Sequence, residues 1–347
     1  KRCGDVWIGP IHPSKMATLG LLMHVMLVGA AALPASELQT TWQTWKGAHK
    51  RVYTSVKEDA RRMAIFAQSK EFVEKHNSRV EKTWTAALNA FSDLTWEEFK
   101  QAKLMDPQEC SATHTSSNWT SPNVQIPEAI DWRDYLPGPW PVKNQAHCGS
   151  CWTFSTIGTM EAHYAWKYKA MVNLSEQQLV DCAGAFNNFG CNGGLPSQAF
   201  EYLHYAGGAD TEAAYPYTGV TGTTCNYDGN PAAQVADVVN ITALNERELL
   251  DALGKVGPVS IAFQVSDDFR FYSDGVYDGV CDRDPDKVNH AVVAVGYGVA
   301  NPTTYAVPYY TVRNSWGADW GVDGYFMIKR GVNKCGLADC ASYPIVG

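Results

Sequence analysis

The sequence predicts an α+β protein whose main body has two halves, one helical and one rich in strands. Three stretches between residues 151 and 206 read as helices: "CWTFSTIGTMEAHYAWKY", "SEQQLVDC" and "LPSQAFEYLHYA". After about Val235, apolar runs bounded by glycine predict strands, as in "GPVSIAFQV", "HAVVAVGYG", "YYTVRNSWG" and "GYFMIKRG". The chain has 347 residues, 45% of them hydrophobic, so it can bury a sizeable core in one or two domains.

The N-terminal stretch carries a targeting signal rather than part of the fold. Met16 is followed by a short apolar run and by small residues suited to cleavage, which predicts a secretory signal peptide over residues 16–35. Residues 1–15, including Cys3, precede this expected start and are left out of the fold. Because the apolar run is too short for a membrane span, we expect no stable membrane anchor. We expect a protein of the secretory pathway, in the lysosome or outside the cell.

The next segment, from Trp42 to about Lys103, is predicted to be mainly helical. The stretch "VKEDARRMAIFAQSKEFVEKHN" has no Gly or Pro and consists mostly of strong helix formers. In "LNAFSDLTWEEF", Ser92 or Asp93 is expected to cap a further turn. Six residues of the first stretch recur at steps of three and four and share one helix face: Glu58, Arg62, Phe66, Ser69, Val73 and Asn77.

Charge divides the chain into a basic front and an acidic body. Residues 36–103 carry a net charge of +3, residues 104–347 carry −13, and the whole chain carries −8 at pH 7. The acidic total argues against a nucleic-acid-binding surface, so we expect no nucleic-acid partner. We expect the two parts to attract each other, and acid to weaken that attraction by protonating carboxylates.

Cysteine usage indicates a disulfide-bonded protein with one free thiol. The chain has ten cysteines, and nine remain once Cys3 is set aside. An odd number of cysteines in a secreted chain indicates a free, reactive thiol. Asn-x-Ser/Thr triplets at Asn118, Asn173 and Asn240 are candidate glycosylation sites on the same secretory route.

The stretch "NQAHCGSCWTFS" (144–155) carries the clearest chemical signal. Its cysteines fit either a redox pair of thioredoxin type or one bridged cysteine beside a nucleophilic one. A zinc site would need a second pair of ligands at metal-binding spacing, which is missing, so we expect no metal. His147 is a nearby base candidate without an asparagine partner. A nucleophilic Cys151 demands a distant His and Asn, and His290 follows after 139 residues and Asn314 after a further 24.

With this set of residues, the chain from Trp42 to Gly347 resembles the papain family of cysteine proteases, and within it the cathepsin H group. The helix face described above resembles the family's propeptide motif, with Ser69 where Asn is usual. The resemblance implies a two-lobed fold, a helical lobe plus a β-barrel-like lobe, with a helical N-terminal propeptide. The implied divisions are an inhibitory propeptide (36–105), a mini-chain (106–113), an excised linker (114–123) and a catalytic domain (124–347).

The resemblance also implies what the protein works with. It would be a monomeric enzyme made as a zymogen, without a cofactor, that hydrolyses peptide and protein substrates. Its own propeptide and cystatin-like proteins would inhibit it.

The same resemblance assigns chemical roles. Cys151, at the first turn of a helix and beside an imidazole, would be a thiolate whose pKa falls to roughly 3–4. His290 would protonate the leaving amine while Asn314 holds its ring, and Trp316 would shield their hydrogen bond from water. Gln145 and the backbone N–H of Cys151 would form the oxyanion hole.

Three nearby glycine or alanine positions complete the expected site. Gly193 and Gly194 would line the substrate groove. Ala146 follows Gln145 where the family usually has Gly, which would restrict the loop that carries the oxyanion donor.

The implied disulfides use eight of the nine cysteines and leave Cys151 free. They are Cys148–Cys191, Cys182–Cys225, Cys281–Cys335 and, as the remaining pair, Cys110–Cys340.

The stretch "DPQECSAT" (106–113) resembles the cathepsin H mini-chain, an octapeptide cut from the propeptide yet kept by a disulfide, with Glu109 where Asn is usual. Its new C-terminus at Thr113 would supply a carboxylate that binds a substrate's free α-ammonium group. This implies an aminopeptidase with some endopeptidase activity. The alternatives are a cathepsin L-like endopeptidase in which Cys110 is a plain staple, a thiol–disulfide oxidoreductase, and a catalytically silent binding protein.

Overall fold

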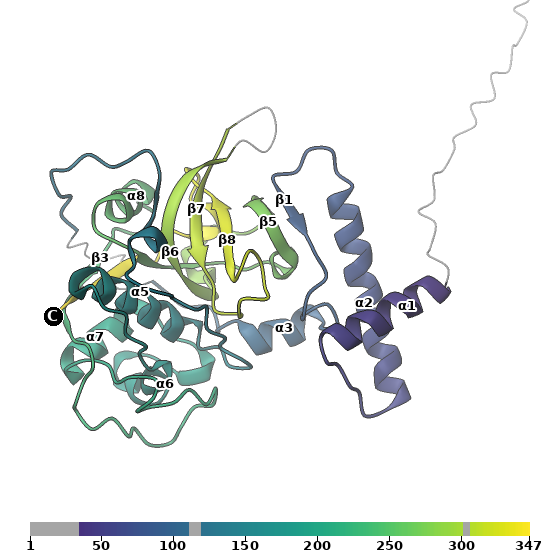
Figure 1. Ribbon diagram of the computed structural model, residues 1–347, viewed down its shortest axis with the longest axis horizontal. Helices are drawn as coiled ribbons and strands as arrows, with labels where there is room; N and C mark the ends of the chain where they lie inside the picture. The colour runs from purple at the N-terminus through teal and green to yellow at the C-terminus, as the bar shows by residue number, and fades with distance from the viewer. Residues whose placement is uncertain (1–34, 111–118, 301–305) are drawn as a thin grey trace, which may run out of the picture.

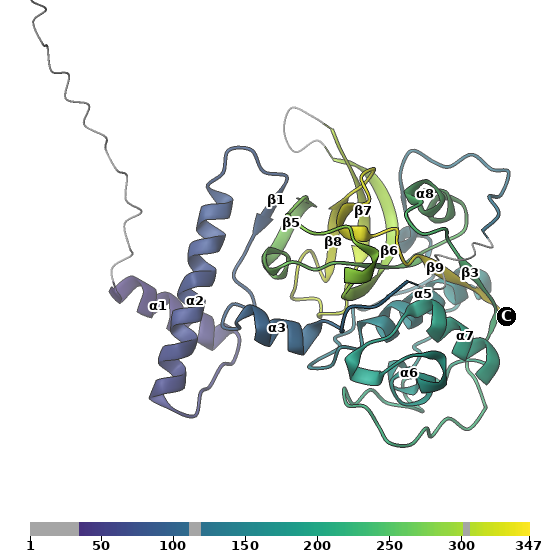
Figure 2. The same ribbon diagram turned by 180° about the vertical axis from the view of Figure 1, so that it is seen from behind.

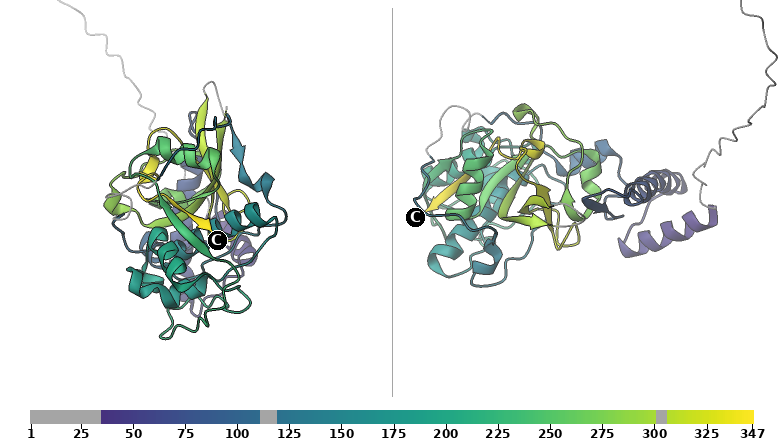
Figure 3. Two further views of the ribbon diagram at one scale, coloured as in Figure 1. Left: turned by 90° about the vertical axis from the view of Figure 1, so that its left-hand side faces the viewer. Right: turned by 90° about the horizontal axis from the view of Figure 1, so that it is seen from above.

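The structure, a computed structural model, describes residues 35–110, 119–300 and 306–347 (Figure 1). The signal peptide expected from the sequence lies outside these residues except for Ala35, and so do Thr113 and Asn118. Figures 1 and 3 show a body of helices and strands, with the first two helices lying beside it.

The N-terminal segment (residues 35–103) is helical, as expected, but it also contains a strand. Its elements are α1 (Ala35–Ala48), α2 (Val56–Asn77), β1 (Trp84–Ala86) and α3 (Trp96–Lys103). Helix α2 covers the predicted stretch. The expected cap of the next helix is wrong, because α3 starts after Thr95, which forms a capping box with Glu98. Ser92 and Asp93 are instead buried in the turn before it.

The predicted face of α2 holds this segment together. Phe66 packs against Trp42 and Trp45 of α1, with ring centroids 5.2 Å apart in both pairs. The Ser69 hydroxyl donates to the backbone carbonyl of Ser92 over 2.9 Å. At two other positions on this face, Arg62 pairs with Glu98 and the Asn77 side chain exchanges two hydrogen bonds with the backbone of Ala86.

The helical half of the body contains three helices, which Figure 2 shows gathered on one side of the sheet. They are α5 (Cys151–Tyr168), α6 (Glu176–Cys182) and α7 (Pro196–Ala206). All three coincide with predicted stretches. Helix α5 is buried along most of its length because it packs against the sheet on one side and against α7 on the other.

The strand-rich half forms one sheet, which β1 of the N-terminal segment extends. The remaining strands are β2 (Ile130–Asp131), β3 (Val235–Asn240), β4 (Val259–Phe263), β5 (Tyr272–Tyr277), β6 (His290–Ala300), β7 (Val307–Arg313), β8 (Tyr325–Lys329) and β9 (Ser342–Val346). The order is β1-β5-β8-β7-β6-β4-β9-β3, with β2 beside β6. Only the β5–β8 pair among these is parallel.

Two features of this half differ from a simple run of strands. Helix α8 (Glu246–Lys255) interrupts it and buries Leu249, Ala252 and Leu253 against the sheet. Strands β3 and β9 pair with each other and pack against α5 and α7, so the end of the chain returns to the helical half. Together these contacts join the two halves into one body.

The N-terminal segment shares the apolar core of the strand-rich half. Trp84, Phe91 and Phe99 belong to the same buried cluster as the inner residues of the sheet. Phe91 and Phe99 meet the Trp316 ring edge-on, at centroid distances of 5.8 and 5.3 Å. The segment is therefore docked by apolar packing and by the backbone pairing of β1 with β5.

The expected charge attraction does not take the form of ion pairs. In the described part of the chain, no ion pair joins residues 36–103 to residues 124–347. The acidic groups of the N-terminal segment that form ion pairs do so with basic residues of the same segment, as in Arg51–Asp93 and Arg62–Glu98. None of the helices described here is long and apolar enough to cross a membrane.

Replacing Phe99 by alanine should undock the N-terminal segment. The fully buried ring packs on Trp316, and removing such a ring costs about 3–5 kcal/mol. In the full-length Phe99→Ala variant, we expect iodoacetamide to alkylate Cys151 about 100-fold faster than in the wild type. Mass spectrometry measures the extent of alkylation over time. Raising NaCl to about 0.5 M should change the wild-type rate less than about twofold, because apolar packing is not screened. A tenfold acceleration by salt would show that charge attraction holds the segment.

Candidate active site

Cys151 lies where the helical half meets the sheet. It is the first residue of α5, it is fully buried, and it is the free cysteine of the described chain. Its Sγ accepts a hydrogen bond from the Ala291 N–H over 3.4 Å. Ala291 follows His290, the first residue of β6, so the structure brings the predicted cysteine and histidine to adjoining positions on α5 and β6.

His290 is held by the asparagine expected from the sequence. The distance between His290 Nε2 and Asn314 Oδ1 is 2.8 Å, and the Ser315 N–H also donates to this oxygen over 2.8 Å. Because an amide oxygen only accepts, the imidazole proton must lie on Nε2. Nδ1 then carries a lone pair, and it is buried without a hydrogen-bond partner among the described residues. Trp316 covers the ring at a centroid distance of 4.8 Å.

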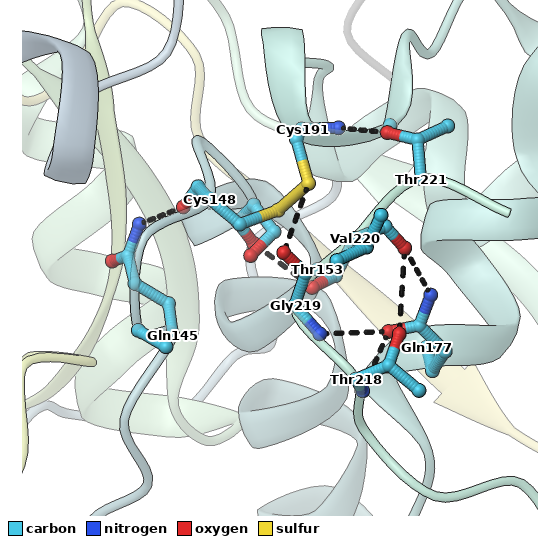
Figure 4. Close-up of a disulfide and its surroundings, with 12 residues drawn as sticks. Gln145, Cys148, Thr153, Gln177, Cys191, Thr218, Gly219, Val220 and Thr221 are labelled. Carbon is cyan, nitrogen blue, oxygen red and sulfur yellow. Dashed lines mark hydrogen bonds between the residues drawn. A yellow bond between two sulfur atoms is a disulfide. The ribbon is translucent and has the colours of Figure 1, made fainter.

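Gln145 lies buried in the loop before α5. Its Oε1 accepts from the Ser315 hydroxyl over 2.8 Å, which turns its amide nitrogen the other way. That nitrogen donates to the carbonyl of Cys148 over 2.8 Å, as Figure 4 shows, and to the carbonyl of Lys103 over 3.0 Å. A side-chain N–H therefore points at a backbone carbonyl of the N-terminal segment.

Ala146 shows how the loop accepts the departure from glycine. Its φ is +54°, in the left-handed region, which costs an L-residue about 1–2 kcal/mol. The Asn144 side chain accepts from the Ala146 N–H over 2.9 Å, and the Lys103 ammonium donates to its carbonyl over 2.8 Å. The expected restriction is present, and neighbouring polar groups hold the loop in place.

Residues 104–108 run across the groove in front of Cys151. The Met105 N–H donates to the carbonyl of Asn289 and the Asp106 N–H to that of Asn192, both over 3.0 Å. The Gln108 N–H donates to the carbonyl of Val288 over 3.1 Å. The segment thus binds both halves of the body through its backbone, as an extended peptide would.

The two candidate glycines lie in different surroundings. A Cβ at Gly193 would lie 2.9 Å from Met105 Cβ and from Gln108 Nε2, so this glycine lines the groove. A Cβ at Gly194 would meet Asn188 and Trp152 inside the helical half. Gly193 therefore lies where an extended chain passes, whereas Gly194 serves the packing behind it.

The covered site favours neutral groups rather than the expected thiolate. Burial raises the pKa of the Cys151 thiol to about 12, because the backbone N–H groups around it do not offset the loss of water. Burial also lowers the pKa of His290 to about 4, despite its hydrogen bond to Asn314. A thiolate–imidazolium pair would have to form after the groove opens. Burial likewise lowers the pKa of Lys103 to about 8.

The structure contains all four implied disulfides. They join Cys110 to Cys340, Cys148 to Cys191, Cys182 to Cys225 and Cys281 to Cys335. Of the candidate glycosylation sites, Asn173 is exposed and Asn240 is half-buried at the end of β3. No group of three or more His, Cys, Asp or Glu side chains in the described ranges could hold a metal ion.

Three residues of this site were not singled out from the sequence. Ser315 orients both Gln145 and Asn314, and its position next to Asn314 was the one available signal. Lys103 and Asn289 act through contacts with residues distant in the chain, to which no local pattern points.

Comparisons with known proteins agree with this geometry. Residues 126–345 match the profile of the papain family cysteine protease, and residues 42–99 match that of the cathepsin propeptide inhibitor domain. Cysteine proteinase 3 of Solanum lycopersicum is 53% identical over 300 residues, which cover 86% of this chain and 82% of that relative. Pro-cathepsin H of Mus musculus is 48% identical over 307 residues, which cover 88% of this chain and 90% of that relative.

Solved structures of precursors have the same fold. The digestive procathepsin L2 proteinase from the Tenebrio molitor larval midgut superposes with a TM-score of 0.81 at 37% identity, covering 88% of this chain and 99% of its own. Recombinant stem bromelain precursor superposes with a TM-score of 0.78 at 33% identity, covering 89% of this chain and 98% of its own. The resemblance, the two-lobed fold and the propeptide expected from the sequence are confirmed.

The buried imidazole predicts that acid uncovers the groove. Covered His290 stays neutral down to about pH 4, whereas an exposed imidazole takes up a proton near 6.5. The covered state is therefore fully stabilised above pH 6.5 and loses stability as the pH falls toward 4. In a Cys151→Ala precursor, which cannot process itself, we expect the open population to rise by up to about tenfold per pH unit in this window.

Hydrogen exchange at the Met105, Asp106 and Gln108 amides, corrected for the intrinsic pH dependence of exchange, measures this opening. The His290→Gln substitution should remove this rise of the open population with falling pH. His163→Gln is the matched control, because burial also lowers the pKa of His163 to about 4, but it lies against Pro258 away from the groove. The same slope in His290→Gln would assign the acid response to another group.

Proposed function

We propose that this chain, which belongs to the papain family of cysteine proteases, acts mainly as an aminopeptidase with some endopeptidase activity. One observation carries the exopeptidase part: the Cys110–Cys340 disulfide ties residues 106–110 to the groove that contains Cys151. The family carries the protease part, and the propeptide inhibitor domain makes the full chain a zymogen.

The proposed reaction uses the side chains of Cys151 and His290, with Asn314 holding the imidazole in place. Once the groove is open, the Cys151 thiol transfers its proton to Nδ1 of His290, the nitrogen that Asn314 does not use. The sulfur attacks the substrate carbonyl to form a tetrahedral intermediate. His290 then protonates the leaving amine as the C–N bond breaks, which leaves a thioester on Cys151. A water molecule, deprotonated by His290, hydrolyses the thioester and restores the thiol.

Gln145 would stabilise the negative oxygen of that intermediate. Its amide nitrogen and the backbone N–H of Cys151 are the proposed donors, and losing one such donor typically costs about 3–4 kcal/mol of barrier. In the precursor, the Lys103 carbonyl accepts from the same amide nitrogen. The propeptide would therefore block the oxyanion site as well as cover the nucleophile.

The tether supports the restriction to N-terminal residues. Cys110, Cys340 and Cys151 belong to one buried cluster. Two residues lie between Cys110 and Thr113, so the Cα atom of Thr113, which carries the new carboxylate, would lie within about 11 Å of the Cα atom of Cys110. Residues 106–108 fill the groove in the precursor, so trimming must let the segment turn about its disulfide before that carboxylate reaches a substrate.

The alternatives are weaker on specific grounds. The redox reading needs Cys148 and Cys151 as partners, but Cys148 is bonded to Cys191. Relatives named pro-cathepsin H are 47–50% identical to this chain, whereas the solved procathepsin L structures are 34–37% identical. This favours the cathepsin H type over a cathepsin L-like endopeptidase. The complete set of catalytic groups disfavours a silent binding protein.

The setting we propose is the secretory pathway, in the lysosome or outside the cell. Four disulfides support an oxidising compartment. The proposed molecule is a monomer that cystatin-like proteins inhibit.

Removing the tether should change the substrate preference. In a processed Cys110→Ser variant, the fragment 106–113 is no longer held, so hydrolysis of an unblocked aminoacyl reporter should fall at least about tenfold. Hydrolysis of an N-blocked dipeptide reporter should rise, because the non-primed side of the groove becomes open. Glu109→Gln keeps the disulfide and is the matched control. Mass spectrometry with and without reduction shows whether the fragment 106–113 has been lost. Unchanged substrate preferences after its loss would rule out the proposed restriction by this fragment.

A further inference from the structure

We propose that Tyr217 is a positioning residue for the oxyanion donor Gln145, because its hydroxyl links the loop of Gln145 to the start of the helix that carries Cys151. The inference rests on the proposed function, in which Gln145 stabilises the oxyanion. Tyr217 lies in the helical half, in the loop after α7, and none of its atoms is expected to touch the substrate.

The hydrogen bonds around this hydroxyl form a chain in which Ser150 donates to Tyr217 and Tyr217 donates to Gln145. Tyr217 donates its single phenolic proton to the backbone carbonyl of Gln145 over 2.8 Å. The distance from the phenol oxygen to Ser150 Oγ is 2.6 Å, so the serine hydroxyl must be the donor in that pair. Ser150 is the N-cap residue of α5, yet its side chain makes no capping hydrogen bond. The serine hydroxyl is thus committed to Tyr217.

The loop of Tyr217 is itself rigidly attached to the helical half. The Tyr217 N–H donates to Glu212 Oε1 over 2.8 Å, and the next N–H donates to Gln177 Oε1 over 2.9 Å. Figure 4 shows the following residues, 218–221, held between Gln177 of α6 and the Cys148–Cys191 disulfide. Phe154 of α5 meets the phenol ring edge-on at 5.0 Å. These contacts therefore fix the position of the Tyr217 hydroxyl relative to the helical half.

Gln145 needs such a contact from the helical half. Ser315, two residues after β7, holds Gln145 from the strand-rich half. Its carbonyl accepts from the Gln145 N–H over 2.9 Å, and its hydroxyl donates to the Gln145 side-chain oxygen over 2.8 Å. These bonds fix Gln145 relative to the sheet. On the α5 side its amide nitrogen, the proposed oxyanion donor, donates to the Cys148 carbonyl, whereas its backbone carbonyl is held by Tyr217. Tyr217 supplies the second reference, since its oxygen bonds both Gln145 and the residue before Cys151.

Ala146 makes this contact more important after activation. The next residue after Gln145 has a φ of +54°, which an alanine adopts less readily than a glycine. In the precursor, Lys103 donates to the Ala146 carbonyl and to the Asn144 side chain. Release of the propeptide removes both bonds, whereas Tyr217 remains. The mature enzyme would then depend on the tyrosine to keep the strained loop in register.

Tyr217→Phe in the processed enzyme tests this role. Active sites are counted with a thiol-directed epoxide, so that only folded enzyme is compared. We expect kcat/KM for an unblocked aminoacyl reporter to fall roughly tenfold, mainly through kcat, because the donor is misplaced rather than removed. An aminoacyl aldehyde, whose adduct carries an oxyanion, should bind weaker by a similar factor. Alkylation of Cys151 by iodoacetamide, which forms no oxyanion, should stay within about twofold.

Tyr215→Phe is the matched control from the same loop. The Tyr215 hydroxyl donates to Asp181 over 2.9 Å and does not contact Gln145, so all three readouts should stay within about threefold. Equal losses in both variants would assign the effect to general loosening of the loop. Equal losses in kcat/KM and alkylation for Tyr217→Phe would assign it to the thiol. An unchanged kcat/KM would also overturn the inference.

A second variant covers the case in which Tyr217→Phe yields no titratable enzyme. Ser150→Ala removes the hydrogen bond into the phenol oxygen and leaves Tyr217 bonded to Gln145. It should lower kcat and aldehyde affinity by roughly twofold to fivefold while alkylation is unchanged, and no such loss would overturn the inference. Failure of the proposed function is recognised separately, because wild-type turnover would then survive complete alkylation of Cys151.

Discussion

The packing of α5 against β6 sets the geometry of the site and joins the two halves of the body. The Ser155 hydroxyl, one turn into the helix, donates to the carbonyl of Val292 over 2.7 Å, and Cys151 accepts from the Ala291 N–H. These polar contacts are buried between apolar side chains, where an unpaired polar group would be costly. They therefore set the position of α5 along β6. Cys151 and His290 thereby meet in a single arrangement.

In the proposed mechanism, the propeptide occupies the same groups that a substrate would use. Its backbone bonds carbonyls on both sides of the groove, and Lys103 offers a carbonyl to Gln145. The aromatic residues Phe91 and Phe99 then seal Trp316 and the imidazole beneath it. Backbone hydrogen bonds make the propeptide sit like a peptide, and apolar packing holds it there without ion pairs across the described interface.

Burial also explains why Cys151, the proposed nucleophile, would be unreactive in the precursor. In a dry site the charged forms of both Cys151 and His290 lose hydration, and their pKa values move apart in the direction that leaves both neutral. The positive end of α5 acts on the same sulfur, but here it is outweighed by the missing water. Activation is therefore a change of solvation as much as a removal of steric cover.

Three helices of the body (α5, α6 and α7), four central strands and the Cys–His–Asn set could be predicted from the amino-acid sequence, and the disulfides followed from the family resemblance. These features depend on local periodicity, on the helix-forming residues of α2 and α5, and on motifs such as "CGSCW" and "RNSWG" whose spacing is visible along the chain. Helix α8 was not predicted, although Asn245 caps a run of strong helix formers there. The propeptide strand β1 and the pairing of β3 with β9 could not be predicted, because their stability comes from partners far away in the chain.

The electrostatics of the site and the contacts that support it depend on the folded structure. Net charges of opposite sign suggested attraction, but ion pairs form only where side chains can meet, and Glu98 and Asp93 already have partners within the propeptide. A helix terminus suggested a thiolate, but a pKa follows from hydration, which only the packed structure defines. Positions such as Tyr217 and Lys103 acquire a role because folding places their polar atoms within 3 Å of the Gln145 loop, a distance that no local pattern encodes.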